Sequence, residues 1–242
     1  MPRTLLPLFA AAAACLLAGC MSPSIDDSAR IGPFYKPTNQ VGDAQLPATL
    51  HRVVVLPISG GEVAPAESAA ALDPVFITEL QKENRFEIVA LSRDECRLRF
   101  HVDEFRSTGV LPHDFVAILQ REHAADAVLF IDLTVYKPYR PITIGVRTKL
   151  ATLGNDVRLL WTFDNVFSAD DPAVANSARR HFLNADRGGV PADLTPSALQ
   201  SPARFAAYVA AATFATLPPV YTPAGFKPAK ETSKSSANPQ AR

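Results

Sequence analysis

Continuous apolar runs rich in β-branched residues recur along the first half of the chain, at residues 52–59, 86–91 and 126–136. Such runs are typical of strands that are buried on both faces of a sheet. Pro57 has no backbone N–H to donate, so we expect the end of the first run to leave the ladder. The pattern therefore predicts three strands of one sheet.

Helix start signals lie between these runs. Asp73-Pro74 offers an N-cap followed by a first-turn proline, residues 92–95 (SRDE) have the form of a capping box, and residues 112–114 (PHD) precede a third apolar stripe. Behind the first signal, Phe76 and Leu80 fall on one helical face. The sequence predicts a helix after each signal.

The second half of the chain predicts a long hairpin. Residues 142–151 and 157–163 alternate apolar and polar side chains on either side of Gly154-Asn155-Asp156, which is typical of two antiparallel strands joined by a turn. Two more helices are expected after Asp171-Pro172 and Ser201-Pro202. Strands that alternate with helices and end in a hairpin predict an α/β fold with a mixed β-sheet, packed helices and a long antiparallel hairpin.

The N-terminus resembles a bacterial lipoprotein signal. Arg3 supplies a positive charge, residues 5–17 form an apolar run, and Ala18-Gly19 is a small-residue cleavage site. Cys20 follows where a lipobox places its cysteine, so the resemblance implies that Cys20 is acylated, for example with palmitate, and holds the mature protein at the membrane. Met21 stands where an aspartate would signal inner-membrane retention, which implies an outer-membrane anchor that faces the periplasm.

Two other interpretations of the N-terminus stay open. One is an uncleaved transmembrane helix, although residues 5–19 are fewer than the roughly 20 apolar residues that a bilayer core requires. The other is a plain secretory signal with an incidental cysteine. The expected organisation is a signal peptide over 1–19, a lipid-anchored flexible tether over 20–48, a globular α/β domain over 49–217 and a disordered tail over 218–242.

The charge balance and the cysteine content limit the classes of partner and chemistry that we expect. Removal of residues 1–19 leaves 23 basic residues beside 24 acidic ones, so we expect no nucleic-acid partner. Cys15 leaves with the signal and Cys20 carries lipid, so Cys96 is left as a single thiol and no intrachain disulfide is expected. A lone cysteine is more often a small buried hydrophobe than a reactive or intermolecular thiol.

The order of elements resembles that of a periplasmic domain. LPIS (56–59), FEIVALSR (86–93), the link 109–112, AADAVLFIDLTVY (124–136) and a hairpin with Leu160-Trp161 follow one another as in the domain shared by the curli-secretion lipoprotein CsgG, the N-terminal domain of TolB and the penicillin-binding-protein activator LpoB. The resemblance covers roughly residues 50 to 168. It implies an interaction domain for secretion or peptidoglycan synthesis, and no catalysis.

A membrane pore is not expected. The only long alternating hairpin is needed to complete the sheet, and Arg147, Lys149 and Arg158 on its polar side would be costly against lipid.

Residues 136–141 (YKPYRP) are the candidate partner-binding segment, with Tyr136, Tyr139 and Arg140 as its contact residues. Two prolines make the segment stiff, and Tyr and Arg are enriched at protein interfaces. The alternative is an ordinary rigid loop whose tyrosines cover the edge of the core. We expect a periplasmic or envelope protein as partner, besides the membrane that holds the anchor, and the sequence allows a homo-oligomer.

Metal-capable side chains gather at residues 101–104 (HVDE) and 122–126 (EHAAD), but neither group has a zinc-site spacing. We therefore predict no metal, cofactor or catalytic residue, and expect a protein that is not an enzyme. The alternative is a lipid-anchored periplasmic hydrolase that uses one of these His, Asp and Glu clusters. Arg179-Arg180-His181 is a basic run near the end of a predicted helix, which could contact acidic lipid or a partner, or only be solvated.

Overall fold

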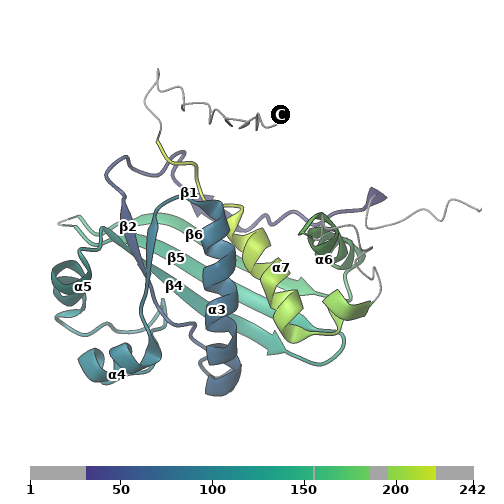
Figure 1. The fold of residues 1–242 in the computed structure, drawn as a ribbon, viewed down its shortest axis with the longest axis horizontal. Coiled ribbons are helices and arrows are strands. Elements are labelled where there is room, and N and C mark those ends of the chain that lie inside the picture. The colour runs from purple at the N-terminus through teal and green to yellow at the C-terminus, as the bar shows by residue number, and fades with distance from the viewer. Residues whose placement is uncertain (1–30, 155, 186–195, 222–242) are drawn as a thin grey trace, which may run out of the picture.

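A six-stranded mixed sheet forms the centre of the structure, a computed structural model that describes residues 31–154, 156–185 and 196–221 (Figure 1). In spatial order the strands are β1 (Gln40–Gly42), β6 (Leu159–Ser168), β5 (Thr143–Thr152), β4 (Ala127–Lys137), β2 (Arg52–Val55) and β3 (Glu87–Ala90). Strand β2 is parallel to β4 and to β3, whereas the other neighbours are antiparallel. The predicted α/β fold with a mixed sheet is confirmed.

Helices cover both faces of this sheet. They are α3 (Ala66–Glu83), α4 (Arg93–Phe100), α5 (Phe115–His123), α6 (Pro172–Ala185) and α7 (Pro202–Phe214), with a 3-10 turn η2 (Pro196–Leu199). Helices α3 and α7 lie side by side on one face, while α4 and α5 lie at the far end of the sheet from α6 (Figure 1). Helices α4 and α5 pack on the face opposite to α3, over β2 and β4.

Strand β2 shows why its apolar run is continuous. Val53 and Val55 belong to the core beneath α3 and α7, whereas Val54 and Leu56 belong to the separate core beneath α4 and α5. Successive side chains of a strand point to opposite faces, so a strand between two helix layers has no solvated side. The strand ends at Val55, before Pro57, as predicted.

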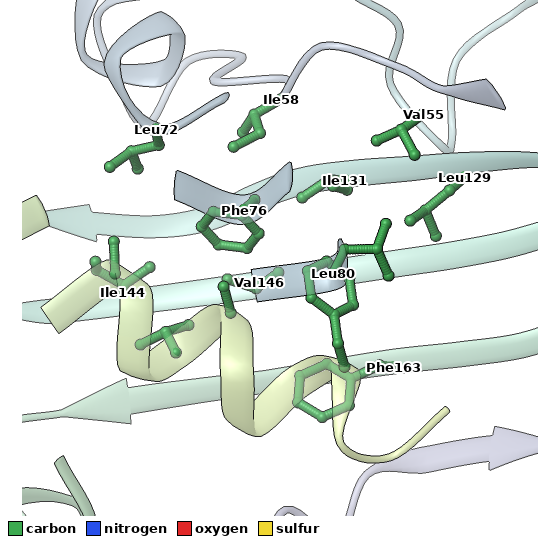
Figure 2. Close-up of a cluster of buried hydrophobic side chains, with 14 of the residues drawn as sticks. Val55, Ile58, Leu72, Phe76, Leu80, Leu129, Ile131, Ile144, Val146 and Phe163 are labelled. Atoms are coloured by element: carbon green, nitrogen blue, oxygen red, sulfur yellow. The ribbon is translucent and has the colours of Figure 1, made fainter. Parts of the chain in front are cut away.

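The larger core is built by α3 on the hairpin. Figure 2 shows Phe76 and Leu80 of α3 over Ile144 and Val146 of β5 and Phe163 of β6, all of them buried. The hairpin β5–β6 thereby forms part of the floor on which α3 packs. The predicted long antiparallel hairpin is confirmed.

Helix α3 begins at Ala66, so the predicted start at Asp73-Pro74 is wrong. Residues 66–72 are rich in alanine, the strongest helix former, and Ala69 and Leu72 extend the buried stripe by two turns. Pro74 lies inside the helix on its exposed side. Burial of the stripe outweighs the one backbone hydrogen bond that proline removes.

The other helix signals are confirmed. Ser92 and Glu95 form the complete capping box of α4, and the Ser201 hydroxyl accepts from the N–H of Arg204 at the start of α7. Asp171 accepts from the N–H of Ala173 at 2.8 Å, so α6 begins where the sequence predicts it.

Residues 31–48 pack on the domain, although the sequence predicts a tether up to residue 48. Strand β1 pairs with β6, Arg158 forms an ion pair with Asp43 at 2.6 Å, and Leu46 is fully buried. The tether prediction is therefore wrong for this segment. A short polar stretch without apolar periodicity can still satisfy the free edge of β6 with backbone hydrogen bonds.

The start of the predicted tail also belongs to the fold, since Pro219 accepts a hydrogen bond from Leu46 N–H at 2.8 Å. The predicted signal peptide, Cys20 and residues 222–242 lie outside the described residues. Within residues 31–154, 156–185 and 196–221, no helix combines the length and the apolar character needed to cross a bilayer.

Substitutions of Trp161 test whether the β5–β6 hairpin is part of the folded core. The Trp161 side chain is 1% exposed, and we expect Trp161→Ala to lower the free energy of unfolding by about 3 to 5 kcal/mol, as large core truncations do. Trp161→Phe is the matched control, with an expected loss of about 1.5 kcal/mol or less because most of the ring volume stays. Urea unfolding followed by circular dichroism measures both, and equal losses in the two variants would contradict the assignment.

Candidate functional site

The predicted partner-binding segment lies at the end of the sheet where α6 begins. It links β4 to β5, and the carbonyl of Ile142 accepts from Ala169 N–H at 2.8 Å, two residues before the Asp171 cap of α6. Tyr139 is 85% exposed and Arg140 is also exposed. Tyr136 is half-buried against the core beneath α3 and α7. The structure therefore separates the three predicted contact residues into an exposed pair and a core-packed one.

A close approach of β4 and β5 holds this segment in place. The β4 strand has a bulge between Leu133 and Val135, and Gly145 of β5 lies opposite it. A β-carbon on Gly145 would stand 2.5 Å from the Thr134 hydroxyl oxygen and 3.0 Å from the Val135 nitrogen. Only glycine fits there, because any side chain would push the strands apart just before the linking segment.

A second candidate site, which includes His101 and Glu104 of the predicted 101–104 cluster, lies beyond the carboxyl ends of β2 and β3. Strand β2 continues into α3 on one face of the sheet, and β3 continues into α4 on the other. Diverging connections of this kind leave a crevice in which α/β proteins bind ligands. Here the crevice encloses about 660 Å³, between Gly61, Ala64, Glu67 and Ala70 on the α3 side and Arg93, Arg97, His101 and Glu104 on the α4 side.

Arg93 joins the two sides of this crevice. Its guanidinium donates to Asp73 of α3 at 2.9 and 3.2 Å, to the Ile58 carbonyl at 2.7 Å and to Glu104 at 3.1 Å. The Arg93 side chain is 16% exposed, so these charge-assisted bonds are largely shielded from water. Arg93 therefore fixes the loop after β2 relative to both helices.

Glu104 lies in the chain after α4. Together with Arg93 and Asp73 it forms a set of charged side chains that we call the Arg93 clamp. Its carboxylate accepts from the Ser59 hydroxyl at 2.9 Å, from Gly61 N–H at 3.1 Å and from Gly60 N–H at 3.3 Å. Burial alone would raise the pKa of Glu104, but these hydrogen bonds and the one from Arg93 lower it below its ordinary value. Glu104 is therefore held as a carboxylate.

Asp73 behaves in the opposite way. Burial raises its pKa, although hydrogen bonds from Ile58 N–H and from Arg93 work against that rise. The clamp thus contains one carboxylate whose charged form the fold stabilises and one whose charged form it penalises. Both are engaged in holding Arg93.

The position of Arg93 carries a sequence signal that the prediction overlooked. Arg93 is the first residue of α4, and a cation at a helix N-terminus is unfavourable unless it is paired. The capping box sets it there, and its partners lie 20 and 11 residues away in the chain. An arginine in a first helical turn therefore indicates carboxylates from other segments.

Acidic residues of the two clusters assigned to the alternative hydrolase form ion pairs and a backbone hydrogen bond. Asp103 pairs with Arg97 at 2.8 Å, and Glu122 pairs with Arg99 at 3.1 Å. Asp126 accepts the N–H of His51 at 2.8 Å. Across the described ranges, no three His, Cys, Asp or Glu side chains are grouped so that they could hold a metal ion.

Cys96 lies on the buried face of α4 and is fully buried, as the sequence favours. Burial raises the pKa of its thiol to about 12, and the nearby charge of Glu95 adds to the rise. A thiol with such a pKa stays protonated at neutral pH and is a poor nucleophile.

The three residues of the basic run 179–181 on α6 make different contacts. Arg180 lies with its guanidinium carbon 4.3 Å from the centre of the Phe34 ring, while Arg179 donates to the Asn176 side chain at 3.3 Å. Burial lowers the pKa of His181, against an opposing effect of Glu79. The run therefore presents two arginines at the surface and a half-buried imidazole.

Arg93→Gln tests the clamp. We expect it to lower the free energy of unfolding by about 2 kcal/mol at pH 7, because Asp73 and Glu104 lose their shared cation. Glu104 has a lowered pKa, so its contribution is present above its ordinary value of 4.5 and is lost as the pH falls through the folded-state value. The difference between wild type and variant should therefore shrink in acid.

Arg97→Gln is the control for the clamp. The Arg97 side chain is 58% exposed, so its ion pairs should contribute less than about 1 kcal/mol. Chemical unfolding at several pH values measures all three proteins. An Arg93 variant as stable as the Arg97 variant would contradict the clamp.

Comparison with known proteins identifies no family. No protein-family model matches the sequence, and no curated protein matches it. Among solved structures, a PelC dodecamer from Paraburkholderia phytofirmans has a TM-score of 0.37 and 12% identity, over 70% of this chain and 94% of that one. Lipoprotein GNA1162 from Neisseria meningitidis has a TM-score of 0.41 and 15% identity, over 56% of this chain and 93% of that one. The resemblance to the CsgG, TolB and LpoB domains stays a prediction.

Proposed function

We propose that this chain is an outer-membrane lipoprotein, anchored through acylated Cys20, whose α/β domain faces the periplasm and binds a protein partner in the cell envelope. The anchor is proposed because Cys20 directly follows Ala18-Gly19 and an apolar run, as in a lipoprotein signal. The proposed role is that of an accessory or assembly factor for secretion or peptidoglycan synthesis. It is a binding role without catalysis.

The partner-binding surface in this proposal is the exposed pair Tyr139 and Arg140. Tyr139 is 85% exposed on a segment with prolines at 138 and 141, so little chain entropy is lost when a partner orders it. An aromatic ring with an adjacent guanidinium supplies the residue types that dominate binding energy at interfaces. Self-association of the domain stays a prediction from the sequence.

Cys20→Ser tests the anchor. Labelling of the wild-type protein with a palmitate analogue should mark a membrane-bound species, and the Cys20→Ser protein should carry no label and leave the membrane fraction. Cys15→Ser is the control, since that residue lies within the predicted signal and its loss should leave labelling intact. Label that persists in the Cys20 variant would refute acylation at this residue.

Tyr139→Ala combined with Arg140→Ala tests the partner surface. We expect the melting temperature to stay within about 2 °C, because exposed side chains contribute little to stability, while the yield of specific envelope crosslinks falls. Tyr221→Ala combined with Arg121→Ala removes an exposed tyrosine and an exposed arginine elsewhere and should leave the crosslinks unchanged. Crosslinking mass spectrometry in the native envelope compares the two, and wild-type yields in the Tyr139 variant would contradict this assignment.

A further inference from the structure

The loop after β2 gathers four hydrogen-bond donors around one carboxylate. The Oε1 atom of Glu104 accepts from the Ser59 hydroxyl at 2.9 Å and from Gly61 N–H at 3.1 Å. Its Oε2 atom accepts from Gly60 N–H at 3.3 Å and from the Arg93 guanidinium at 3.1 Å. Each oxygen therefore receives two donors, and we call the four donor groups the carboxylate cradle.

The carboxylate cradle is held in place by contacts that do not involve Glu104. Ser59 N–H donates to the Ile131 carbonyl and the Ser59 carbonyl accepts from Leu133 N–H, both at 2.8 Å, so the loop is fixed to β4. Arg93 is fixed to α3 by a hydrogen bond of 2.9 Å. The donors are therefore positioned in advance for an anion, which limits the entropy that is lost when one binds.

Two glycines suit this loop to an anion. Gly61 has a φ of 50°, in the left-handed region that other residues rarely adopt, and a β-carbon on Gly60 would lie 2.9 Å from the Ala64 carbonyl oxygen. Successive backbone N–H groups in such a turn form a concave nest that binds anions. Here both N–H groups point at the carboxylate of Glu104.

Glu104 fills the carboxylate cradle from an irregular connection. Residues 101–106 lie outside helices, strands and turns, and the Glu104 side chain is 24% exposed. Together with Gly61 and Arg93, Glu104 lines the crevice of about 660 Å³ between α3 and α4. The carboxylate can therefore rotate into the crevice without displacing a helix or a strand, and a dissolved ligand can reach the same donors.

The charge around the carboxylate cradle favours a carboxylate over a phosphate. Hydrogen bonds lower the pKa of Glu104 although burial alone would raise it, so the donors favour an anion. The cation of Arg93 is also shared with Asp73, at 2.9 Å. A carboxylate would replace that of Glu104 charge for charge, whereas a phosphate dianion would add a second negative charge close to Asp73 and be repelled by it.

We propose that the crevice binds a carboxylate of a peptide ligand, and that Glu104 occupies the carboxylate cradle as an internal competitor until the peptide replaces it. The small side chains of Ala64, Ala66 and Ala70 line the α3 side of the crevice and leave room for the chain behind the carboxylate. Capture of a carboxylate by a nest of backbone N–H groups is a recurring mode of peptide recognition. The proposal goes beyond the proposed function and depends neither on the lipid anchor nor on Tyr139.

Glu104→Ala in the full mature chain with Cys20→Ser empties the carboxylate cradle. We expect about 100 mM sodium acetate to raise the melting temperature of this variant by about 2 to 4 °C relative to sodium chloride of the same ionic strength. The parent chain with Cys20→Ser alone and its Glu104→Gln variant, whose cradles stay filled, should change by less than about 1 °C. An equal rise in all three chains, or a folded Glu104→Ala chain that shows no rise, would overturn the proposal.

Phosphate tests the class of anion on the same Glu104→Ala chain. Sodium phosphate of the same ionic strength should raise the melting temperature less than acetate does, because Asp73 repels the second charge. A larger rise in phosphate than in acetate would overturn the carboxylate as the ligand group.

Peptide binding to the parent chain tests the native site and does not require Glu104→Ala to fold. The probes are acetylated trialanine with a free carboxylate, the same peptide as its amide, and an acetylated alanyl-glutamyl-alanine amide. We expect the nuclear magnetic resonance signals of the Gly60 and Gly61 N–H groups to shift with a probe that carries a carboxylate, because both groups donate to that carboxylate. A shift with the first probe alone assigns a chain end, and a shift with the third alone assigns a side chain. No shift with either, or an equal shift with trialanine amide, would overturn the proposal.

Affinities for the carboxylate probe locate the site and the competitor. Glu104→Ala should bind the probe at least about tenfold more tightly than its parent, because an internal group competes at a high effective concentration. In the Glu104→Ala chain, Ser59→Ala removes one donor of the carboxylate cradle and should weaken binding about tenfold. The control is Ser168→Ala in the same chain, which removes a hydroxyl at the end of β6 and should change the affinity less than about twofold. Equal affinities of parent and Glu104→Ala would overturn the role of Glu104, and equal losses in the two serine variants would overturn the cradle as the binding site.

Discussion

Burial of β2 and β4 on both faces is the constraint on which the rest of the structure depends. Their parallel pairing aligns Val53 with Ala127 and Val55 with Leu129, and alternate residues enter opposite cores. A strand pair with no solvated side requires helices above and below, so the chain must cross from one face to the other between β2 and β4. This crossing places α3 and α4 on opposite sides and opens the crevice between them.

The crevice is held by polar contacts because backbone that leaves a buried strand must satisfy its polar groups. Arg93 and Glu104 together bond the Ile58 carbonyl, the Ser59 hydroxyl and the Gly61 N–H. Glu104, which belongs to the predicted 101–104 cluster, thus also holds the loop after β2. The pKa shifts of the two carboxyl groups follow from this role. Hydrogen-bond donors lower the pKa of Glu104 against the effect of burial, whereas burial raises the pKa of Asp73.

The two ends of the sheet differ in their chemistry. The end with α4 and α5 is rich in paired charges such as Arg97 with Asp103 and Arg99 with Glu122. The end with α6 carries the exposed Tyr139 and Arg140. The proposed partner surface therefore lies at the end of the sheet opposite to the paired charges of α4 and α5 (Figure 1).

The sequence by itself determined the local elements of this protein. Period-two alternation predicted the β5–β6 hairpin, the continuous apolar run predicted the doubly buried β2, and Ser92 with Glu95 predicted the start of α4. The candidate segment at residues 136–141 was also visible in the sequence, and its exposed pair lies where a strand-to-strand link must lie. These features depend on neighbouring residues and on burial alone, so a one-dimensional pattern carries them.

Only the tertiary structure decided the features that join distant segments. The sequence gives no apolar period for β1, which exists because β6 offers it a free edge, and α3 starts before Pro74 because Ala69 and Leu72 find a core to fill. The Arg93 clamp likewise assembles from residues far apart in the chain. Backbone pairing at a sheet edge and long-range charge pairing leave no periodic trace in a sequence, because their energy comes from contacts that exist only after the chain has folded.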